Sequence, residues 1–407
     1  MFYTENEIFN YFNTLNKDTS HYNNSNDICT PMGCVKEMID EIPEEFWKRD
    51  NIKILDCCAG NGNFPAYISL KTDVTNIWAN EINPKRLTNL VNYFEGKINI
   101  INEDFLTFPT KEEYDLVVAN PPFAKFTESG VRAAKNHSLS RDFLMKAIEV
   151  TKANGYIVFI LPNNWMSFAD RNKLPSILSQ YQFITINIEE CKHWFPGVGS
   201  SFTWFVLRKS SNVGMTKIIN SYKIKDTQYA QITPGVNYIP LYYNNLVYSI
   251  FNKTINANNT KFKVETSSDL HKYTKKQYLS DNPSEEYCYK VIHTPRQTVW
   301  SNRPHKFQDG WKIYIATTTN YETFIDNCGM TQSIAFIRCV SKEEAELFQQ
   351  ELNNKLYYFL VAITRYGNFN NERIMQRFPR LNEVSLTEEE WNFITEFNKI
   401  YYKKDFN

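Results

Sequence analysis

The sequence predicts an α/β fold: a mostly parallel seven-stranded sheet in the first half of the chain, followed by a mixed α+β domain. Seven short apolar runs alternate with helical patterns between residues 52 and 207. Such continuous apolar runs are typical of strands that are buried beneath helices on both faces. Beyond residue 207 the alternation stops, so a second architecture is expected there.

The seven expected strands are residues 52–55, 77–79, 98–101, 116–119, 156–161, 184–188 and 202–207. In sheets of this kind, ligands bind beyond the carboxyl ends of the strands. The residues that directly follow the runs are therefore the first candidates for a functional site.

The length of 407 residues suits about two domains, each able to bury its own core. A polar stretch of small residues, 210–216, is expected to link a first domain, 1–209, to a second, 217–407. In the second domain, residues 342–365 have helical spacing, with Ser341 as the expected N-cap.

The composition argues against several classes of protein. Basic and acidic residues number 45 each, which disfavours a general polyanion binder. The eight cysteines show no paired Cys-x-x-Cys spacing, so we expect neither a disulfide framework nor a metal site. Because there is no run of eighteen apolar residues and no signal-type start, a cytoplasmic protein without a membrane partner is expected.

The first two strand ends predict a nucleoside site. A turn with Gly60 and Gly62 follows Asp56, and glycine there lets the backbone approach a ligand closely. Glu81 follows the second run, about where such sheets place the acid that accepts both ribose hydroxyls. Any tight strand-to-helix turn also uses glycine, and Asp104 after the third run is, taken alone, better explained as a solvated loop acid.

The most specific feature is the tetrapeptide Asn120-Pro121-Pro122-Phe123 after the fourth run. Its two prolines remove two backbone donors and fix the chain path, so nearby carbonyl oxygens keep lone pairs that face outward. An amine conjugated to an aromatic ring is a poor nucleophile, and acceptors around its NH₂ group support the charge that develops during attack. The Asn120 side chain and the Pro121 carbonyl would be those acceptors, and Phe123 would stack on the base.

With these motifs, residues 30–207 resemble the amino-methylating DNA methyltransferases of restriction–modification type, with a TaqI-like or Eco57I-like layout. The resemblance implies a Rossmann-like domain that binds S-adenosylmethionine and methylates adenine N6 in a short DNA sequence. Double-stranded DNA is then the expected partner, beside a cognate restriction endonuclease that would act separately. The target nucleotide would be extruded from the duplex into the pocket.

The resemblance also implies roles for single residues. The implied cofactor contacts are Thr30, Asp56, Ala59, Gly60, Gly62, Glu81, Ile82, Asp104, Phe105, Asn120 and Phe143. Phe195 stands where the family places a ring that stacks on the extruded base, together with Phe123. The sequence departs from the family's usual turn at Cys57, Cys58 and Asn61, which puts the strength of cofactor binding in question.

Recognition of the DNA sequence is assigned to the C-terminal half. Residues 261–312 contain 10 Lys or Arg and 6 Asp or Glu, a balance that also suits an ordinary solvated face. The candidate DNA contacts are Lys272, Lys275, Lys276, Arg296, Arg303 and Lys306.

Three alternatives remain open. A different amine acceptor (cytosine N4, ribosomal RNA guanine or protein glutamine) is disfavoured by the 200 residues after Leu207 and by Asn, rather than Ser, at position 120. A bifunctional restriction enzyme would need a nuclease centre, for which we find no convincing carboxylate pair. A non-catalytic DNA-binding subunit is disfavoured by the intact tetrapeptide.

Overall fold

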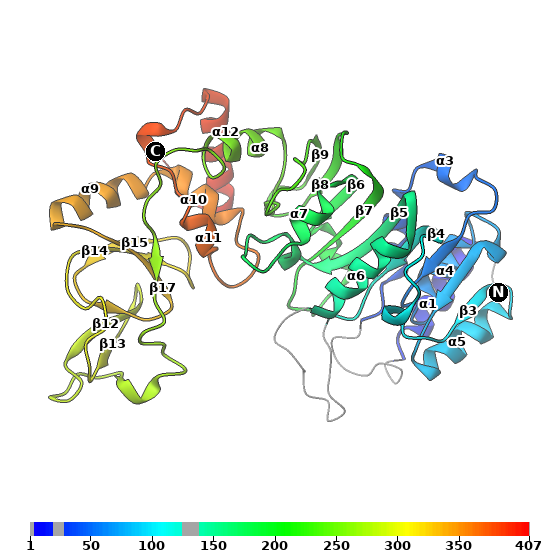
Figure 1. Ribbon diagram of the computed structural model, residues 1–407, viewed down its shortest axis with the longest axis horizontal. Helices are drawn as coiled ribbons and strands as arrows, with labels where there is room; N and C mark the ends of the chain where they lie inside the picture. Colours follow the sequence, from blue (N-terminus) through cyan, green and yellow to red (C-terminus); the bar gives the residue numbers. More distant parts are fainter. Residues whose placement is uncertain (1–3, 19–27, 124–137, 407) are drawn as a thin grey trace. The chain divides into compact units, whose positions relative to one another are not determined.

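The computed structural model describes residues 4–18, 28–123 and 138–406. The chain divides into two compact units. The first consists of Met1–Trp165 and Lys173–Asn237, and the second of Met166–Asn172 and Tyr238–Asn407. Figure 1 shows one large sheet in the first unit, and smaller sheets with several helices in the second.

A nine-stranded sheet in the order β3-β2-β1-β4-β5-β7-β6-β8-β9 forms the centre of the first unit. β7 runs antiparallel to β5 and β6, and β9 antiparallel to β8, while the other neighbours are parallel. The strands are β1 (Ile54–Asp56), β2 (Ile77–Asn80), β3 (Asn99–Ile101), β4 (Tyr114–Ala119), β5 (Thr151–Pro162), β6 (Tyr181–Ile188), β7 (Phe202–Ser211), β8 (Thr216–Asn220) and β9 (Asp226–Ala230). The first seven strands confirm the predicted mostly parallel sheet, and β8 and β9 extend it beyond the prediction.

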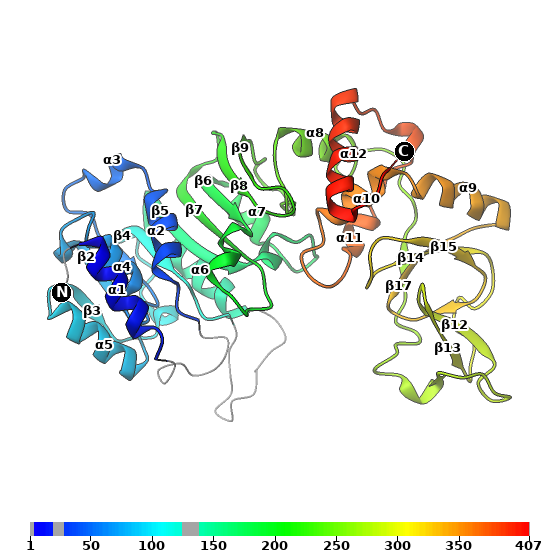
Figure 2. The ribbon, with the colours of Figure 1, turned by 180° about the vertical axis from the view of Figure 1, so that it is seen from behind.

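Helices cover both faces of this sheet. α6 lies in front of it in Figure 1, whereas α1 and α2 lie in front of it in Figure 2, which shows the other side. The helices of this unit are α1 (Glu5–Leu15), α2 (Met32–Asp40), α3 (Glu44–Trp47), α4 (Asn63–Ile68), α5 (Pro84–Phe94), α6 (Ser138–Val150) and α7 (Leu174–Leu178). Val35, Phe64, Leu90 and Val118 belong to one buried apolar core that joins helices to strands and fixes the loops after β1 and β4.

The structure differs from the predicted linker at 210–216. Residues 210 and 211 end β7, and Thr216 begins β8, so the stretch lies inside the first unit. Its polar groups are bonded to that unit: the buried Asn212 Nδ2 donates to the carbonyls of Ser179 and Ile232, at 2.8 and 2.7 Å. Small polar residues therefore mark a tight strand connection here. Apart from residues 166–172, which belong to the second unit, the chain passes from the first unit to the second between residues 237 and 238.

The second unit combines two four-stranded sheets with helices, in agreement with the predicted α+β class. The sheet orders are β10-β17-β14-β15 and β11-β13-β12-β16. The elements are α8 (Asn245–Lys253), β10 (Glu265–Thr266), β11 (Leu279–Ser280), β12 (Tyr289–Thr294), β13 (Gln297–Ser301), β14 (Lys312–Ala316), β15 (Thr323–Asp326), β16 (Gly329–Met330), β17 (Ile334–Arg338), α9 (Lys342–Leu352), α10 (Lys355–Ala362), α11 (Glu372–Met375) and α12 (Glu388–Tyr402).

The helical pattern predicted at 342–365 forms two helices, α9 and α10, rather than one. Ser341 caps α9 as predicted, since its side chain accepts from the Glu344 N–H at 3.2 Å. Asn354 caps α10 by accepting from the Leu356 N–H at 2.9 Å, and this second cap starts a new helix. In the described parts of the chain, no helix has the length and apolar character needed to span a membrane.

Candidate active site

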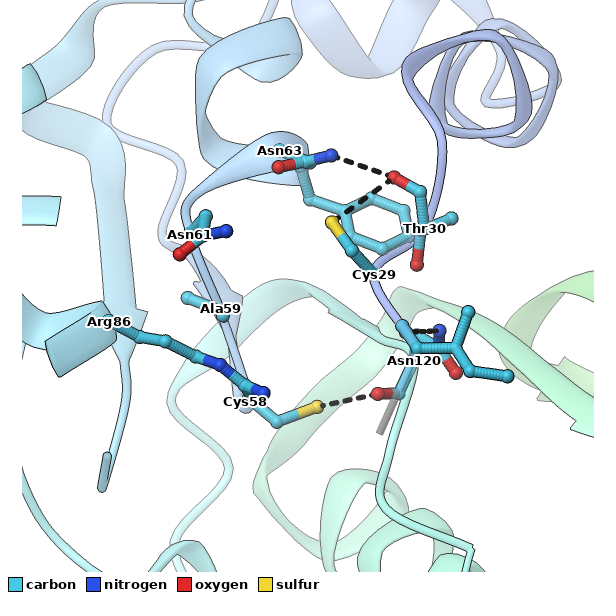
Figure 3. A pocket seen from close by; sticks show the side chains of 11 residues that line it. Cys29, Thr30, Cys58, Ala59, Asn61, Asn63, Arg86 and Asn120 are labelled. Atoms are coloured by element: carbon cyan, nitrogen blue, oxygen red, sulfur yellow. Dashed lines mark hydrogen bonds between the residues drawn. The ribbon is translucent and has the colours of Figure 1, made fainter. Parts of the chain in front are cut away.

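A cavity lies at the carboxyl ends of β1 and β4, with an empty volume of about 430 Å³ that includes open solvent at its mouth. Four predicted site residues line it: Thr30, Ala59, Gly60 and Asn120. Figure 3 shows side chains from the loop before α2, the turn after β1, helix α5 and the end of β4 around this space. The lining residues that the sequence did not single out as functional are Ile28, Cys29, Cys58, Asn61, Asn63, Phe64 and Arg86.

The glycine turn has the backbone that glycine was expected to supply. Gly60 and Gly62 have φ values of +58° and +99°, both in the left-handed region. A Cβ at Gly60 would meet no atom within 4 Å, so this residue leaves the cavity wall open. Gly62 lies outside the cavity lining and is the N-cap of α4, where a Cβ would lie 2.8 Å from Leu90 Cδ2.

Glu81 holds this turn in place. Its carboxylate oxygens accept from the main-chain N–H groups of Gly60 and Asn83, each at 2.7 Å. The residue is 5% exposed and is not part of the cavity lining. Glu81 thus joins the ends of β1 and β2, and its bond to Gly60 reaches the cavity wall.

Asp56 is a buried acid beneath the same turn. One oxygen, Oδ1, accepts from the Cys58 N–H at 3.2 Å, and Oδ2 has no hydrogen-bond partner within the described structure. Burial raises the pKa of Asp56 to about 8; the Cys58 N–H opposes this shift, and the negative charge of Glu81 adds to it. A carboxyl group with one unused buried oxygen can accept or donate one further hydrogen bond here.

The raised pKa of Asp56 predicts that its contribution to stability is lost with increasing pH. The unfolded chain ionises this group near 3.8 and the folded chain only near 8, so the folded state binds more protons between these values. Relative to Asp56→Asn, the wild-type free energy of unfolding should therefore fall as the pH rises from about 4 to about 8. Urea titrations of both proteins at several pH values measure this difference, and a difference that does not change with pH would contradict the prediction.

Two hydrogen bonds orient Asn120 at the cavity wall. Its side-chain Nδ2 donates to the Ile28 carbonyl at 3.0 Å, which leaves the amide oxygen Oδ1 as the acceptor of that side chain. Its main-chain carbonyl accepts from the Cys58 thiol, with an Sγ–O distance of 3.3 Å. Asn63 Nδ2 donates to the Thr30 carbonyl at 2.7 Å and so fixes the segment beside Ile28. Figure 3 shows these contacts around one space.

The predicted adenine-binding residues lie outside the cavity lining. Ile82 is 66% exposed, and Asp104 is an exposed cap whose side chain accepts from the Leu106 N–H at 3.0 Å. Phe105 and Phe143 are buried, with ring centroids 5.5 Å apart. The family-derived contacts of these four residues with a cofactor therefore stay predictions.

The two predicted base-stacking rings pack on a common neighbour. The centroids of Phe123 and Phe195 lie 5.6 and 5.1 Å from that of Phe202. Phe123 is partly buried, whereas Phe195 is 3% exposed and belongs to the apolar core. Stacking on an extruded base would therefore require Phe195 to move. Within the tetrapeptide, Pro121 is buried and Pro122 is exposed.

The candidate DNA contacts in the second unit differ in their surroundings. Arg303 is held by Asp269, at 2.9 and 3.4 Å to the two carboxylate oxygens, and its guanidinium lies 4.9 Å from the Tyr278 ring centroid. Lys306 Nζ lies 4.8 Å from the Phe307 ring centroid. By contrast, the ion pairs found among the described residues do not involve Lys272, Lys275, Lys276 or Arg296.

Comparison with known proteins identifies the central part of the chain. Residues 47–195 match the family model described as Eco57I restriction-modification methylase. This segment is of the restriction–modification methylase type. The match covers the turn after β1 and the Asn120–Phe123 tetrapeptide, so the resemblance inferred from the motifs is confirmed for this region.

The methylase segment has relatives among curated proteins. The Type II methyltransferase M.HincII of Haemophilus influenzae is 27% identical over 206 residues, which are 47% of this chain and 38% of that protein. The tRNA1(Val) (adenine(37)-N6)-methyltransferase of Actinobacillus pleuropneumoniae is 29% identical over 127 residues, 28% of this chain and 53% of that protein. The chain thus matches well under two thirds of the length of these relatives.

A solved structure resembles both units. A nuclease-deletion mutant of the Type ISP restriction-modification enzyme LlaGI, in complex with a DNA substrate mimic, superimposes with a TM-score of 0.59. The alignment covers 95% of this chain and 55% of that chain, at 11% sequence identity. At this identity the likeness concerns the fold alone.

Proposed function

We propose that the chain transfers the methyl group of S-adenosylmethionine to the N6 amine of adenine within a short specific DNA sequence. The observation that carries this proposal is the orientation of Asn120: its Nδ2 is bonded to Ile28, which leaves Oδ1 as the acceptor beside the cavity. The match of residues 47–195 to restriction-modification methylases supports the reaction class. The tRNA adenine-N6 relative supports adenine as the acceptor base.

Two features of the turn beside the cavity support S-adenosylmethionine as its ligand. Gly60 leaves the wall open where a side chain would intrude. Asp56 keeps one buried oxygen without a hydrogen-bond partner, and the Glu81 carboxylate holds the Gly60 N–H of the turn. When bound, the cofactor supplies an electrophilic methyl group on a sulfonium.

The residues of the chain would then bind and orient the acceptor amine. Asn120 Oδ1 and the Pro121 carbonyl would accept the two N–H groups, which favours a pyramidal nitrogen with its lone pair directed at the methyl group. No ionisable base is needed before attack, because the proton can leave after the new bond has formed. Phe123 would stack on the extruded base and offset part of the lost stacking energy.

The test is methylation of plasmid DNA in cells that express the chain and lack other adenine methylation. The expected result is N6-methyladenine at one fixed position of a short recurrent sequence. The tRNA relative makes adenine N6 in RNA the second candidate. Modified adenine in cellular RNA but not in plasmid DNA would favour that candidate, and methylated cytosine would contradict the adenine assignment.

Binding to the DNA backbone is assigned to the loop at residues 272–276 of the second unit. Replacing Lys272, Lys275 and Lys276 together by alanine should weaken DNA binding and reduce the slope of log K against log salt by up to about three. Arg303→Ala is the contrasting variant, because its guanidinium is already bonded to Asp269; it should lower thermal stability with little change in that slope. Binding measured at several salt concentrations separates the two results, and an unchanged slope in the triple variant would refute the assignment.

A further inference from the structure

We propose that Cys58 is a positioning residue for methyl transfer, because its thiol holds the main-chain carbonyl of Asn120 beside the cavity. The sulfur lies 3.3 Å from that oxygen, a distance suited to an S–H···O hydrogen bond. Both residues line the cavity, and Figure 3 shows the contact at its lower edge. The inference rests on the proposed function, in which Asn120 binds the acceptor amine.

This contact continues the pairing of β1 with β4. The strands are parallel neighbours, with Asp56 opposite Val118, and the Cys57 N–H donates to the Val118 carbonyl at 3.3 Å. Beyond that bond, the two chains turn away to form the cavity wall. Compared with the bond between Cys57 and Val118, the bond between Cys58 and Asn120 lies one residue later in the first segment and two residues later in the second. It therefore connects the glycine turn to the tetrapeptide.

The tetrapeptide needs an anchor of this kind. Pro121 and Pro122 have no N–H, so main-chain donors at these two positions cannot fix the peptide that carries the acceptor carbonyl. The segment can instead be held through its acceptors, and the Asn120 carbonyl accepts from the Cys58 thiol. The Asn120 side chain is held separately, by Ile28. Asn120 is thus fixed by two elements, the turn after β1 and the segment before α2.

The thiol is suited to donate. The neighbouring Cys57 thiol, together with burial, raises the pKa of Cys58 well above its ordinary value, so the thiol is protonated at neutral pH. Cys29 also lines the cavity, but its thiol contacts the carbonyl of its own neighbour, Thr30, at 3.8 Å. Of the thiol hydrogen bonds found in the described part of the chain, the one from Cys58 reaches the tetrapeptide.

The test compares Cys58→Ala, which removes the donor, with Cys58→Ser, which keeps a hydroxyl donor. Single-turnover methylation at saturating S-adenosylmethionine should be roughly tenfold slower in Cys58→Ala and largely restored in Cys58→Ser. Cofactor affinity, measured by titration, should stay within about threefold of wild type in both variants. Cys288→Ala, which removes an exposed thiol of the second unit, is the matched control and should leave the rate unchanged.

An unchanged rate in Cys58→Ala would overturn the inference. So would a loss confined to cofactor affinity, or a serine variant as slow as the alanine variant. If Cys58→Ala does not fold, Cys58→Val takes its place as a donor-free side chain of similar size. A second measurement does not depend on turnover. The infrared S–H stretching band of Cys58 is identified as the band that is absent in Cys58→Ser, and we expect it at the lower frequency of a hydrogen-bonded thiol. A band at the frequency of a free thiol would refute the contact.

The same assay separates this inference from the proposed function. If wild type methylates DNA and Asn120→Ala does not, an undiminished Cys58→Ala variant refutes only the positioning role. If wild type transfers no methyl group to any nucleic acid, the proposed function fails and this inference fails with it.

Discussion

Asn120→Ala should slow methyl transfer by roughly 10²- to 10³-fold while S-adenosylmethionine binding survives. The variant removes the amide oxygen that would accept from the target amine during attack. It also removes the bond from Nδ2 to Ile28, but the main-chain carbonyl and its bond to Cys58 stay in place. The loss should therefore appear in the chemical step at saturating cofactor.

Single-turnover rates with DNA, together with a cofactor titration, distinguish a catalytic from a binding defect. The matched control is Asn63→Ala: Asn63 also lines the cavity, and its Nδ2 likewise donates to a main-chain carbonyl, that of Thr30, but it lies in α4 and not in the tetrapeptide. That variant should weaken cofactor binding more than it slows transfer at saturation. Undiminished turnover in Asn120→Ala would remove the catalytic assignment.

Gly62→Ala should destabilise the first unit by about 2–5 kcal/mol. Two costs combine at this residue: a φ of +99°, which side-chain-bearing residues rarely adopt, and a Cβ 2.8 Å from Leu90 and 3.0 Å from Phe94. Both neighbours belong to the buried core, so neither can move without disturbing the packing of α5.

Gly60→Ala is the matched control for this prediction. Its φ is also positive, at +58°, but the added methyl group would meet no atom within 4 Å. It should cost only the backbone strain of about 1 kcal/mol, with weaker cofactor binding because the methyl group enters the cavity. Denaturant titration of both variants without ligand measures the difference, and equal losses of stability would show that the contacts with Leu90 and Phe94 carry no cost.

The fold could be predicted where strands are buried on both faces, because their sequences are continuously apolar. β8 and β9 lack such a run. In Thr216–Asn220 only alternate residues are buried, and in Asp226–Ala230, which is mostly polar, only Ala230 is buried. The domain division was misplaced for a related reason. A polar stretch predicts a linker only if its side chains are solvated, and Asn212 is buried and bonded.

The cavity lining could be predicted where residues closely follow a strand end, as Gly60 follows β1 and Asn120 follows β4. The position of Glu81 beneath the turn could not, because a strand-end acid reaches either a ligand or a neighbouring N–H, and the sequence does not distinguish the two. For Cys58, the sequence indicates only that it departs from the usual residue of the family's turn, and it does not predict a contact with Asn120. Its contact depends on how close β1 and β4 remain after their ladder ends, which no local pattern encodes.

Pro121 and Pro122 also limit the methods that can detect motion at the end of β4. Positions 121 and 122 have no exchangeable main-chain amide proton, so hydrogen–deuterium exchange gives no signal for the two central residues of the tetrapeptide. The side-chain NH₂ of Asn120 is a better reporter, since the proton that is bonded to the Ile28 carbonyl should exchange with solvent faster when that bond opens. Isotope labelling of asparagine side chains would therefore reveal opening of this segment that a backbone experiment would miss.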